Sequence, residues 1–98
     1  MIEYLYNAIR ATSGSTLTIA ARIADDDGAP ITSGAHFMLF DNEETHLFTV
    51  DGNYSANDDC WEFIVDKELT ANKYGRYWYC ICVEGEPLCF KLPFYLVK

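Results

Sequence analysis

Positive charge is scarce in this sequence. Its 98 residues contain seven Lys and Arg against 15 Asp and Glu, which gives a formal net charge of −8 at pH 7. Proteins that bind DNA or RNA use clusters of Lys and Arg to neutralise phosphates, and anionic membranes attract similar clusters. We therefore expect neither nucleic acid nor a membrane as a partner.

Long apolar runs are also missing. No run approaches the roughly 18 residues that suggest a membrane-spanning helix. The first ten residues lack the basic start and the apolar segment of about seven or more residues that mark a secretory signal. We therefore expect a soluble protein that is made and kept in the cytoplasm.

Catalytic patterns are absent as well. The only imidazoles belong to His36 and His46, and neither stands in a known catalytic motif. There is no Gly-x-Ser-x-Gly, no His-Glu-x-x-His and no glycine-rich phosphate loop. Nucleophilic catalysis needs a side chain activated by a nearby base. We expect that the protein is not an enzyme, and we assign no catalytic residue and no cofactor.

The four cysteines, Cys60, Cys80, Cys82 and Cys89, lack the Cys-x-x-Cys spacing of zinc and redox sites. Cys80 and Cys82 are two residues apart and would face the same side of a strand. Cytoplasmic cysteines are usually thiols, so we favour a structural role and assign no metal ligand. Two alternatives stay open: a Cys82–Cys89 disulfide, and a metal site of Cys80, Cys82, Cys89 and a histidine.

Acidic residues cluster in the segments 25–28 and 58–59, and Asp51 stands beside Gly52. Clustered carboxylates suit calcium, but an EF-hand loop needs alternating ligands and a Glu at its twelfth position, and that spacing is missing. Asp followed by Gly is ordinary turn chemistry. We interpret these segments as solvated turns and leave weak calcium binding open.

Apolar residues are plentiful: half of the chain is hydrophobic, and 15% of it is aromatic. A chain of this size and composition predicts a single domain over residues 1–98 with one core. Residues 16–24 alternate, with Leu17, Ile19 and Ile23 on one face, and this period of two is typical of a strand. Residues 60–65 alternate in the same way, and we expect Trp61 to be the central aromatic residue of the core.

Seven strands are expected in total, at residues 3–11, 16–24, 35–40, 45–50, 60–65, 74–84 and 88–97, with a loop at 51–59. Only residues 66–72 have helical character, which is too short for a crossover between parallel strands. The sequence therefore predicts an all-β fold, an antiparallel immunoglobulin-like β-sandwich of about seven strands. A small barrel is the alternative.

The last two expected strands join at a tight turn. Pairing Val83 with Leu88 keeps their apolar faces together and would set Cys82 opposite Cys89. Pro93 has no N–H to donate, which favours an edge position or a bulge for the last strand.

Four aromatic residues fall on strand faces that the alternation turns away from the core: Tyr4, Tyr6, Trp78 and Tyr95. Exposed rings on a small sandwich often lie in an interface. Cover by a curved sheet or a neighbouring strand explains them equally well.

The segment Gly75-x-Tyr77-x-Tyr79 resembles the corner before the penultimate strand of immunoglobulin-like sandwiches. The resemblance implies structural roles for Gly75, Tyr77 and Tyr79. Tyr77 would be the tyrosine-corner residue, whose hydroxyl bonds back to the preceding loop. Tyr79 stands where antibody domains carry a disulfide cysteine, which argues against the antibody subclass.

Over residues 14–97 the order of features resembles that of small phage tail and baseplate proteins, especially the N-terminal immunoglobulin-like domain of the baseplate upper protein family. The features are the strand at 16–24, the turn containing Asp27, Gly28 and Pro30, the strand at 34–40 and the Gly75 hairpin. This resemblance implies a non-enzymatic phage or prophage structural protein, present in the cytoplasm during assembly and in the virion afterwards. Its partners would be other phage structural proteins or further copies of itself.

For such a role we expect the contact residues Trp78, Tyr95, Lys91 and Arg76 around one exposed sheet face. The alternative function is a carbohydrate-binding or adhesin-like sandwich, in which exposed Tyr and Trp rings stack on sugars and the acidic loops hold calcium.

Overall fold

The computed structural model describes residues 2–5, 8–84, 86–87 and 91–98, and it is all-β apart from one short helix. The strands of the described part are β1 (Ile2–Leu5), β2 (Ala8–Thr12), β3 (Leu17–Ala21), β4 (Ala35–Phe40), β5 (His46–Ser55), β6 (Cys60–Val65), β7 (Gly75–Val83), β8 (Glu86–Pro87) and β9 (Leu92–Val97), and the helix is α1 (Lys67–Thr70). No helix of this part of the chain is long and apolar enough to cross a membrane.

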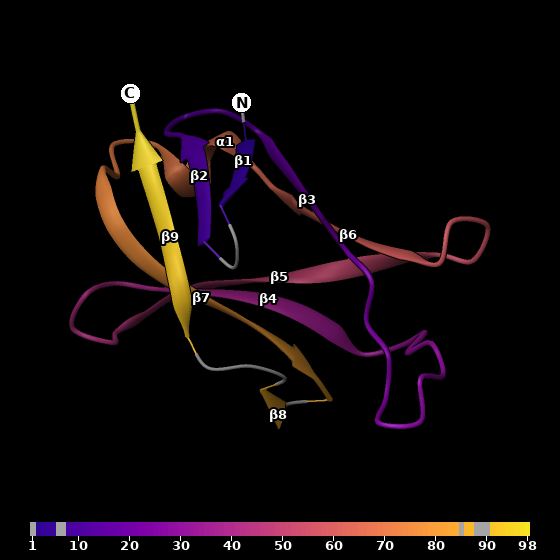
Figure 1. The fold of residues 1–98 in the computed structure, drawn as a ribbon. Coiled ribbons are helices and arrows are strands. Elements are labelled where there is room, and N and C mark those ends of the chain that lie inside the picture. The colour runs from indigo at the N-terminus through magenta and orange to yellow at the C-terminus, as the bar shows by residue number, and fades with distance from the viewer. Residues whose placement is uncertain (1, 6–7, 85, 88–90) are drawn as a thin grey trace.

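The strands form two layers that share one strand. Along the hydrogen-bonded path the order is β1-β2-β9-β7-β4-β5-β6-β3, with β8 paired to β7 off this path. Strand β5 pairs with β4 as far as Asp51 and with β6 from Gly52 onward. Figure 1 shows β2 beside β9 in one layer and β3 beside β6 in the other. The sheet therefore bends round through β5 and approaches a barrel.

One pairing is parallel, which differs from the purely antiparallel arrangement that the sequence predicted. Strand β2 runs parallel to β9, from Ile9 opposite Phe94 to Thr12 opposite Val97, whereas the other paired strands are antiparallel. Strands β2 and β9 lie at opposite ends of the sequence, so no tight hairpin fixes their relative direction. Alternation within a strand carries no information about such a partner.

The main hydrophobic cluster lies between the two layers. Phe37 of β4 is at its centre, with ring centroids 5.5 Å from Tyr79, 5.9 Å from Phe94 and 6.2 Å from Phe63. The alternation predicted for residues 16–24 and 60–65 is confirmed, because Leu17, Ile19, Trp61, Phe63 and Val65 are all buried.

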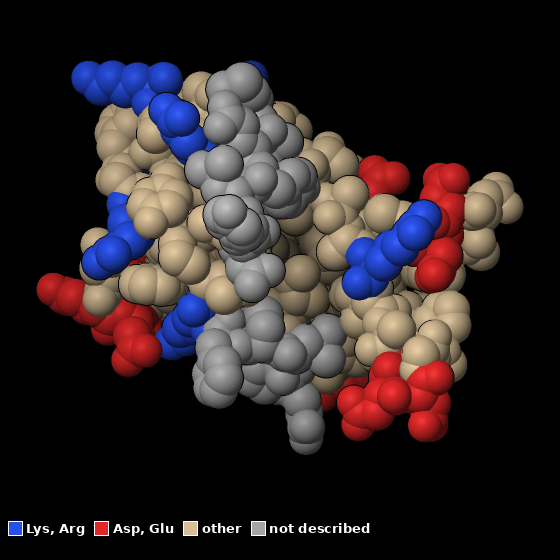
Figure 2. All heavy atoms as spheres, in the orientation of Figure 1, with Lys and Arg blue, Asp and Glu red and all other residues tan. Residues whose placement is uncertain are grey.

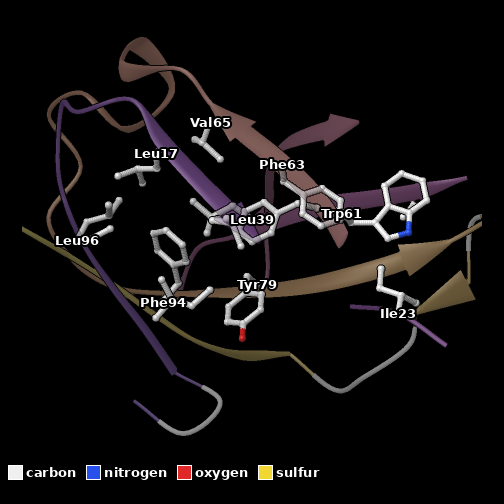
Figure 3. Close-up of a cluster of buried hydrophobic side chains, with 14 residues drawn as sticks. Leu17, Ile23, Leu39, Trp61, Phe63, Val65, Tyr79, Phe94 and Leu96 are labelled. Atoms are coloured by element: carbon white, nitrogen blue, oxygen red, sulfur yellow. The ribbon is translucent and has the colours of Figure 1, made fainter. Parts of the chain in front are cut away.

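Trp61 is buried as expected but lies at one end of this cluster. Figure 3 shows it beside Ile23, with Leu17 and Leu96 toward the opposite end. Its ring contacts Phe63 and Tyr54, and its Nε1 donates a hydrogen bond of 2.7 Å to the carbonyl of Ile31. Phe37, rather than Trp61, is the residue that joins the aromatic rings of both layers.

Several predicted strand ranges differ from the structure, and β3, predicted to run to residue 24, ends at Ala21. Residues 3–11 form two strands, and β1 folds back to pair with β2 as an antiparallel hairpin. Strand β5 continues to Ser55, although a loop was predicted from residue 51. Its exposed polar residues Asp51 and Asn53 suggested a loop, but they alternate with Gly52 and Tyr54, which face the core residues Phe63 and Trp61.

The expected register of the last hairpin is also wrong. Val83 lies opposite Glu86 and Cys82 lies opposite Pro87, so the turn is tighter than the predicted pairing of Val83 with Leu88. Leu88 and Cys89 lie outside the described residues, so the Cys82–Cys89 disulfide stays untested. Strand β9 is flanked by β7 and β2 and is therefore not an edge strand, although Pro93 precedes the first residue paired with β2.

The short helix α1 is hydrogen-bonded to the turn between β2 and β3. Thr70 is fully buried, its carbonyl accepts a hydrogen bond of 2.7 Å from the Ser13 hydroxyl, and its own hydroxyl accepts one of 3.0 Å from the Gly14 amide. Asp66 stands at the N-cap position of α1, and its side chain makes no capping hydrogen bond. The connection between layers is therefore held by Thr70.

Candidate functional site

Strand β7 presents its two faces to different surroundings. Tyr77, Tyr79 and Ile81 pack against the main hydrophobic cluster. The alternate residues turn to the opposite side, which we call the outer face of β7. The residues of this outer face are Arg76, Trp78, Cys80 and Cys82.

The first half of the outer face combines aromatic rings with a cation. The Arg76 guanidinium carbon lies 5.1 Å from the centroid of the Trp78 ring. Trp78 Nε1 donates a hydrogen bond of 3.2 Å to Asn42 Oδ1. Arg76 lies opposite Tyr95 in the β7–β9 register. The structure thus brings three of the four predicted contact residues onto one sheet face.

Lys91, the fourth predicted contact residue, lies against the neighbouring strand β4. Its Nζ is 4.2 Å from the centroid of the Phe40 ring and 3.5 Å from Glu44 Oε1. Phe40 is opposite Trp78 in the β4–β7 register, so Lys91 belongs to the same surface. The Glu44 carboxylate neutralises its charge, whereas Arg76 has no ion pair among the described residues.

An open hollow of about 430 Å³ lies beside Arg76, between the turn after β4 and the start of β7. Tyr74 is 53% exposed, and Lys98 Nζ lies 5.9 Å from the centroid of its ring. The residues that line the hollow are Asp41, Asn42, Glu43, Tyr74, Gly75, Arg76 and Tyr77. Sequence reasoning missed Tyr74 and Asn42, because the β4–β7 pairing that brings them together has no local signal.

The second half of the outer face is rich in sulfur. Cys80 Sγ lies 3.7 Å from Cys82 Sγ, and Cys82 Sγ lies 3.4 Å from Met38 Sδ. Both thiols are buried, and they cluster with Phe40 and with the partly buried Met38 and Trp78. The shared face of Cys80 and Cys82 was predicted. Met38 was missed, because it reaches them from β4.

Three of the residues predicted to be structural, Gly75, Tyr77 and Tyr79, lie on β7. Gly75 has φ +103°, in the left-handed region that favours glycine, and Tyr79 stacks on Phe37 with an interplanar angle of 17°. Tyr77 packs against the main cluster, but within the described residues its hydroxyl forms no hydrogen bond to the preceding loop. The tyrosine corner therefore lacks its defining bond here.

The polar residues considered for catalysis or metal binding have local partners. The Asp25 carboxylate accepts hydrogen bonds of 2.9 Å from the amides of Asp27 and Ala29, so it closes its own turn. His36 Nδ1 lies 2.7 Å from Asp51 Oδ1, and His46 Nε2 lies 2.7 Å from Thr49 Oγ1. In the described part of the chain, no three His, Cys, Asp or Glu side chains gather in a way that could hold a metal ion.

Charge is distributed unevenly on the face of the molecule that Figure 2 draws. Most of the visible Lys and Arg lie on the left of this face, and Asp and Glu lie at its lower left and right. Because the protein has only seven Lys and Arg and a net charge of −8, Arg76 is one of few cationic side chains.

The geometry defines an all-β domain with an aromatic and cationic surface on one sheet. No protein-family model, curated protein or solved structure matches this chain.

Proposed function

We propose that this protein is a non-enzymatic, immunoglobulin-like module that acts by protein–protein contact through the outer face of β7 and the adjoining face of β9. The observation that carries the proposal is the group formed by Arg76, Trp78 and Tyr95 on one sheet face. Arg, Trp and Tyr are the residue types enriched where protein interfaces derive most of their binding energy.

The pairing order supports the immunoglobulin-like assignment. Immunoglobulin domains divide their strands so that the second, fourth and fifth lie in one sheet and the third, sixth and seventh in the other. Here β3, β6 and the second half of β5 form one layer, and β4, β7 and β9 lie in the other. The continuous β5 and the parallel β2–β9 pair are departures from an antiparallel sandwich.

The assignment to a phage or prophage tail or baseplate rests on the resemblance of residues 14–97 described above. In that setting the partners are other phage structural proteins or further copies of the chain, and the protein passes from the cytoplasm into the virion. No nucleic acid or membrane is involved in the contact.

The test is capture of partners by the purified protein, combined with light scattering to measure self-association. Trp78→Ala should weaken association by about 2 kcal/mol or more if Trp78 is a hot spot. Because Trp78 also packs against the second cluster, Arg76→Ala provides a variant whose exposed side chain is removed with less effect on folding.

Ile64→Ala is the matched control. Ile64 is 45% exposed and lies on β6, in the other layer. Association that survives Ile64→Ala and is lost in both Trp78→Ala and Arg76→Ala supports the proposal. A monomer that captures no partner, or equal loss in all three variants, contradicts it.

The hollow beside Arg76 favours a second candidate function, a carbohydrate-binding or adhesin-like module. Tyr74 offers an exposed ring for stacking on a sugar, and Asn42, Glu43 and Arg76 offer hydrogen-bond groups. A glycan array with and without a chelator tests this function, and Tyr74→Ala should abolish any signal. Glycan binding that persists in Tyr74→Ala excludes this hollow as the site.

A further inference from the structure

We propose that Cys80, Cys82 and Met38 form a binding site for Cu(I). The inference is independent of the proposed interface function. It starts from three sulfur atoms on adjacent strands: Cys80 Sγ and Cys82 Sγ are 3.7 Å apart on β7, and Met38 Sδ of β4 is 3.4 Å from Cys82 Sγ.

The backbone explains why these atoms converge. Cys80 and Cys82 are separated by one residue on a strand, so their side chains point to the same face. Met38 lies directly opposite Cys80 in the antiparallel β4–β7 register, on that same face. Regular pairing of the two strands therefore assembles the three ligands without a loop.

The sulfur separations suit a shared ion. A metal–thiolate bond is about 2.3 Å long, so two sulfur ligands of one trigonal or tetrahedral ion lie roughly 4 Å apart. The observed 3.7 Å and 3.4 Å are slightly shorter, and small side-chain shifts outward would admit the ion. The flexible, partly exposed Met38 can make such a shift.

The donor set selects the metal. Two thiolates and one thioether are soft ligands, and such ligands favour Cu(I). A structural zinc site is normally completed by four Cys or His ligands, and among the described residues this cluster contains only two. The apolar surroundings, Phe40 and the partly buried Trp78, limit access of water to the sulfur atoms, as is usual around sites of this kind.

Binding is an exchange of a metal ion for protons. One Cu⁺ enters, the thiols of Cys80 and Cys82 each lose a proton to solvent, and the thioether of Met38 donates a lone pair without releasing a proton. No electron is transferred. The filled site has a net charge of −1, and the Lys91 ammonium lies on the Phe40 ring of the same cluster.

The test is a competition between the reduced protein and a Cu(I)-selective chromogenic chelator, carried out without oxygen and with Cu(I) as the probe. We expect one ion per chain, held with sulfur neighbours that X-ray absorption can count as three. Met38→Leu preserves the volume and apolar character of the side chain but removes its sulfur. It should weaken Cu(I) binding by at least about tenfold, since loss even of a supporting residue costs about 10–100-fold in metal affinity.

Cys80→Ser and Cys82→Ser should remove tight binding, and Cys60→Ser is the matched control. Cys60 is a third cysteine of the described residues, and it lies on β6, where its Sγ is 3.5 Å from the Trp61 carbonyl. Unchanged affinity in Met38→Leu overturns the proposal, as does a Cys60→Ser variant that loses as much affinity as Cys80→Ser. Thermal unfolding of each variant without metal identifies any that fail to fold, and Met38→Leu remains the deciding variant.

Discussion

The ring of Trp61 occupies the space that a side chain at position 52 would need. A Cβ built on Gly52 would lie 2.6 Å from Trp61 Cε3 and 2.7 Å from Phe63 Cε1. Gly52 is also the residue at which β5 leaves β4 and begins to pair with β6. The missing side chain thus lets the shared strand approach the core where the two layers meet.

Gly52→Ala should therefore destabilise the fold. The added methyl group collides with two buried rings, and overpacking of this kind costs about 1–3 kcal/mol. Chemical denaturation measures the loss. Asn53→Ala, at the next and exposed position of β5, should change the free energy of unfolding by less than about 0.5 kcal/mol. Equal stability of the two variants would show that the rings move aside.

Thr70→Val should also destabilise the protein. It removes the hydroxyl that accepts the Gly14 amide hydrogen bond, while nearly preserving the volume of a fully buried side chain. An unsatisfied donor of this kind costs about 1–3 kcal/mol. Thr70→Ser keeps the hydroxyl and should reduce the free energy of unfolding by less than Thr70→Val does. A smaller reduction in Thr70→Val than in Thr70→Ser would mean that packing, rather than the hydrogen bond, stabilises the turn after β2.

Ile9→Ala tests whether β2 belongs to the core. Ile9 is 2% exposed and lies opposite Phe94 in the parallel pair. Truncation of a buried Ile to Ala costs about 2–5 kcal/mol. Thr12→Ala, on the same strand but turned to the other face, should have a small effect. Retention of full stability in Ile9→Ala would show that β2 is dispensable to the fold.

The pKa of Tyr54 is raised above its usual value of 10.0, first by the hydrogen bond that its hydroxyl donates to Asp59 Oδ1 at 2.9 Å, then by burial and by the Asp59 charge. Because the folded state favours the neutral phenol, this contribution to stability is fully present below about pH 10. It is lost as the pH rises through the raised pKa.

Asp59→Asn should lower the pKa of Tyr54 toward its usual value, since the carboxylate charge is removed. Asn suits this position because residue 59 has φ +48°, which Asn tolerates. A carbon NMR titration of labelled tyrosine follows Tyr54 directly. Asp58→Asn removes a neighbouring charge without removing the hydrogen-bond partner of Tyr54. If Asp58→Asn lowers the pKa of Tyr54 by the same amount, the shift comes from nearby negative charge in general rather than from the hydrogen bond to Asp59.

The face that each strand buries could be predicted from the sequence, whereas the pairing of the strands with one another could not. Alternation placed Leu17, Ile19 and Trp61 in the core correctly, because the period of two in a strand is a local property. It also placed Arg76 and Trp78 on one outer face. Their part in an interface remains a proposal.

The features that were missed depend on strand pairing rather than on alternation within one strand. The second half of β5 resembles a loop until its hairpin with β6 is known, and the parallel β2–β9 pair joins opposite ends of the sequence. The same holds for the candidate sites: Met38 and Asn42 approach β7 only because β4 lies beside it. A single sequence carries no direct signal of these contacts.

Strand β5 links the two layers covalently, because its first half pairs with β4 and its second half pairs with β6. Neither layer can separate from the other without breaking backbone hydrogen bonds on one side of Gly52. The amides of β3 in one layer and of β7 in the other should therefore exchange with solvent through one cooperative opening, so that the domain melts as a whole.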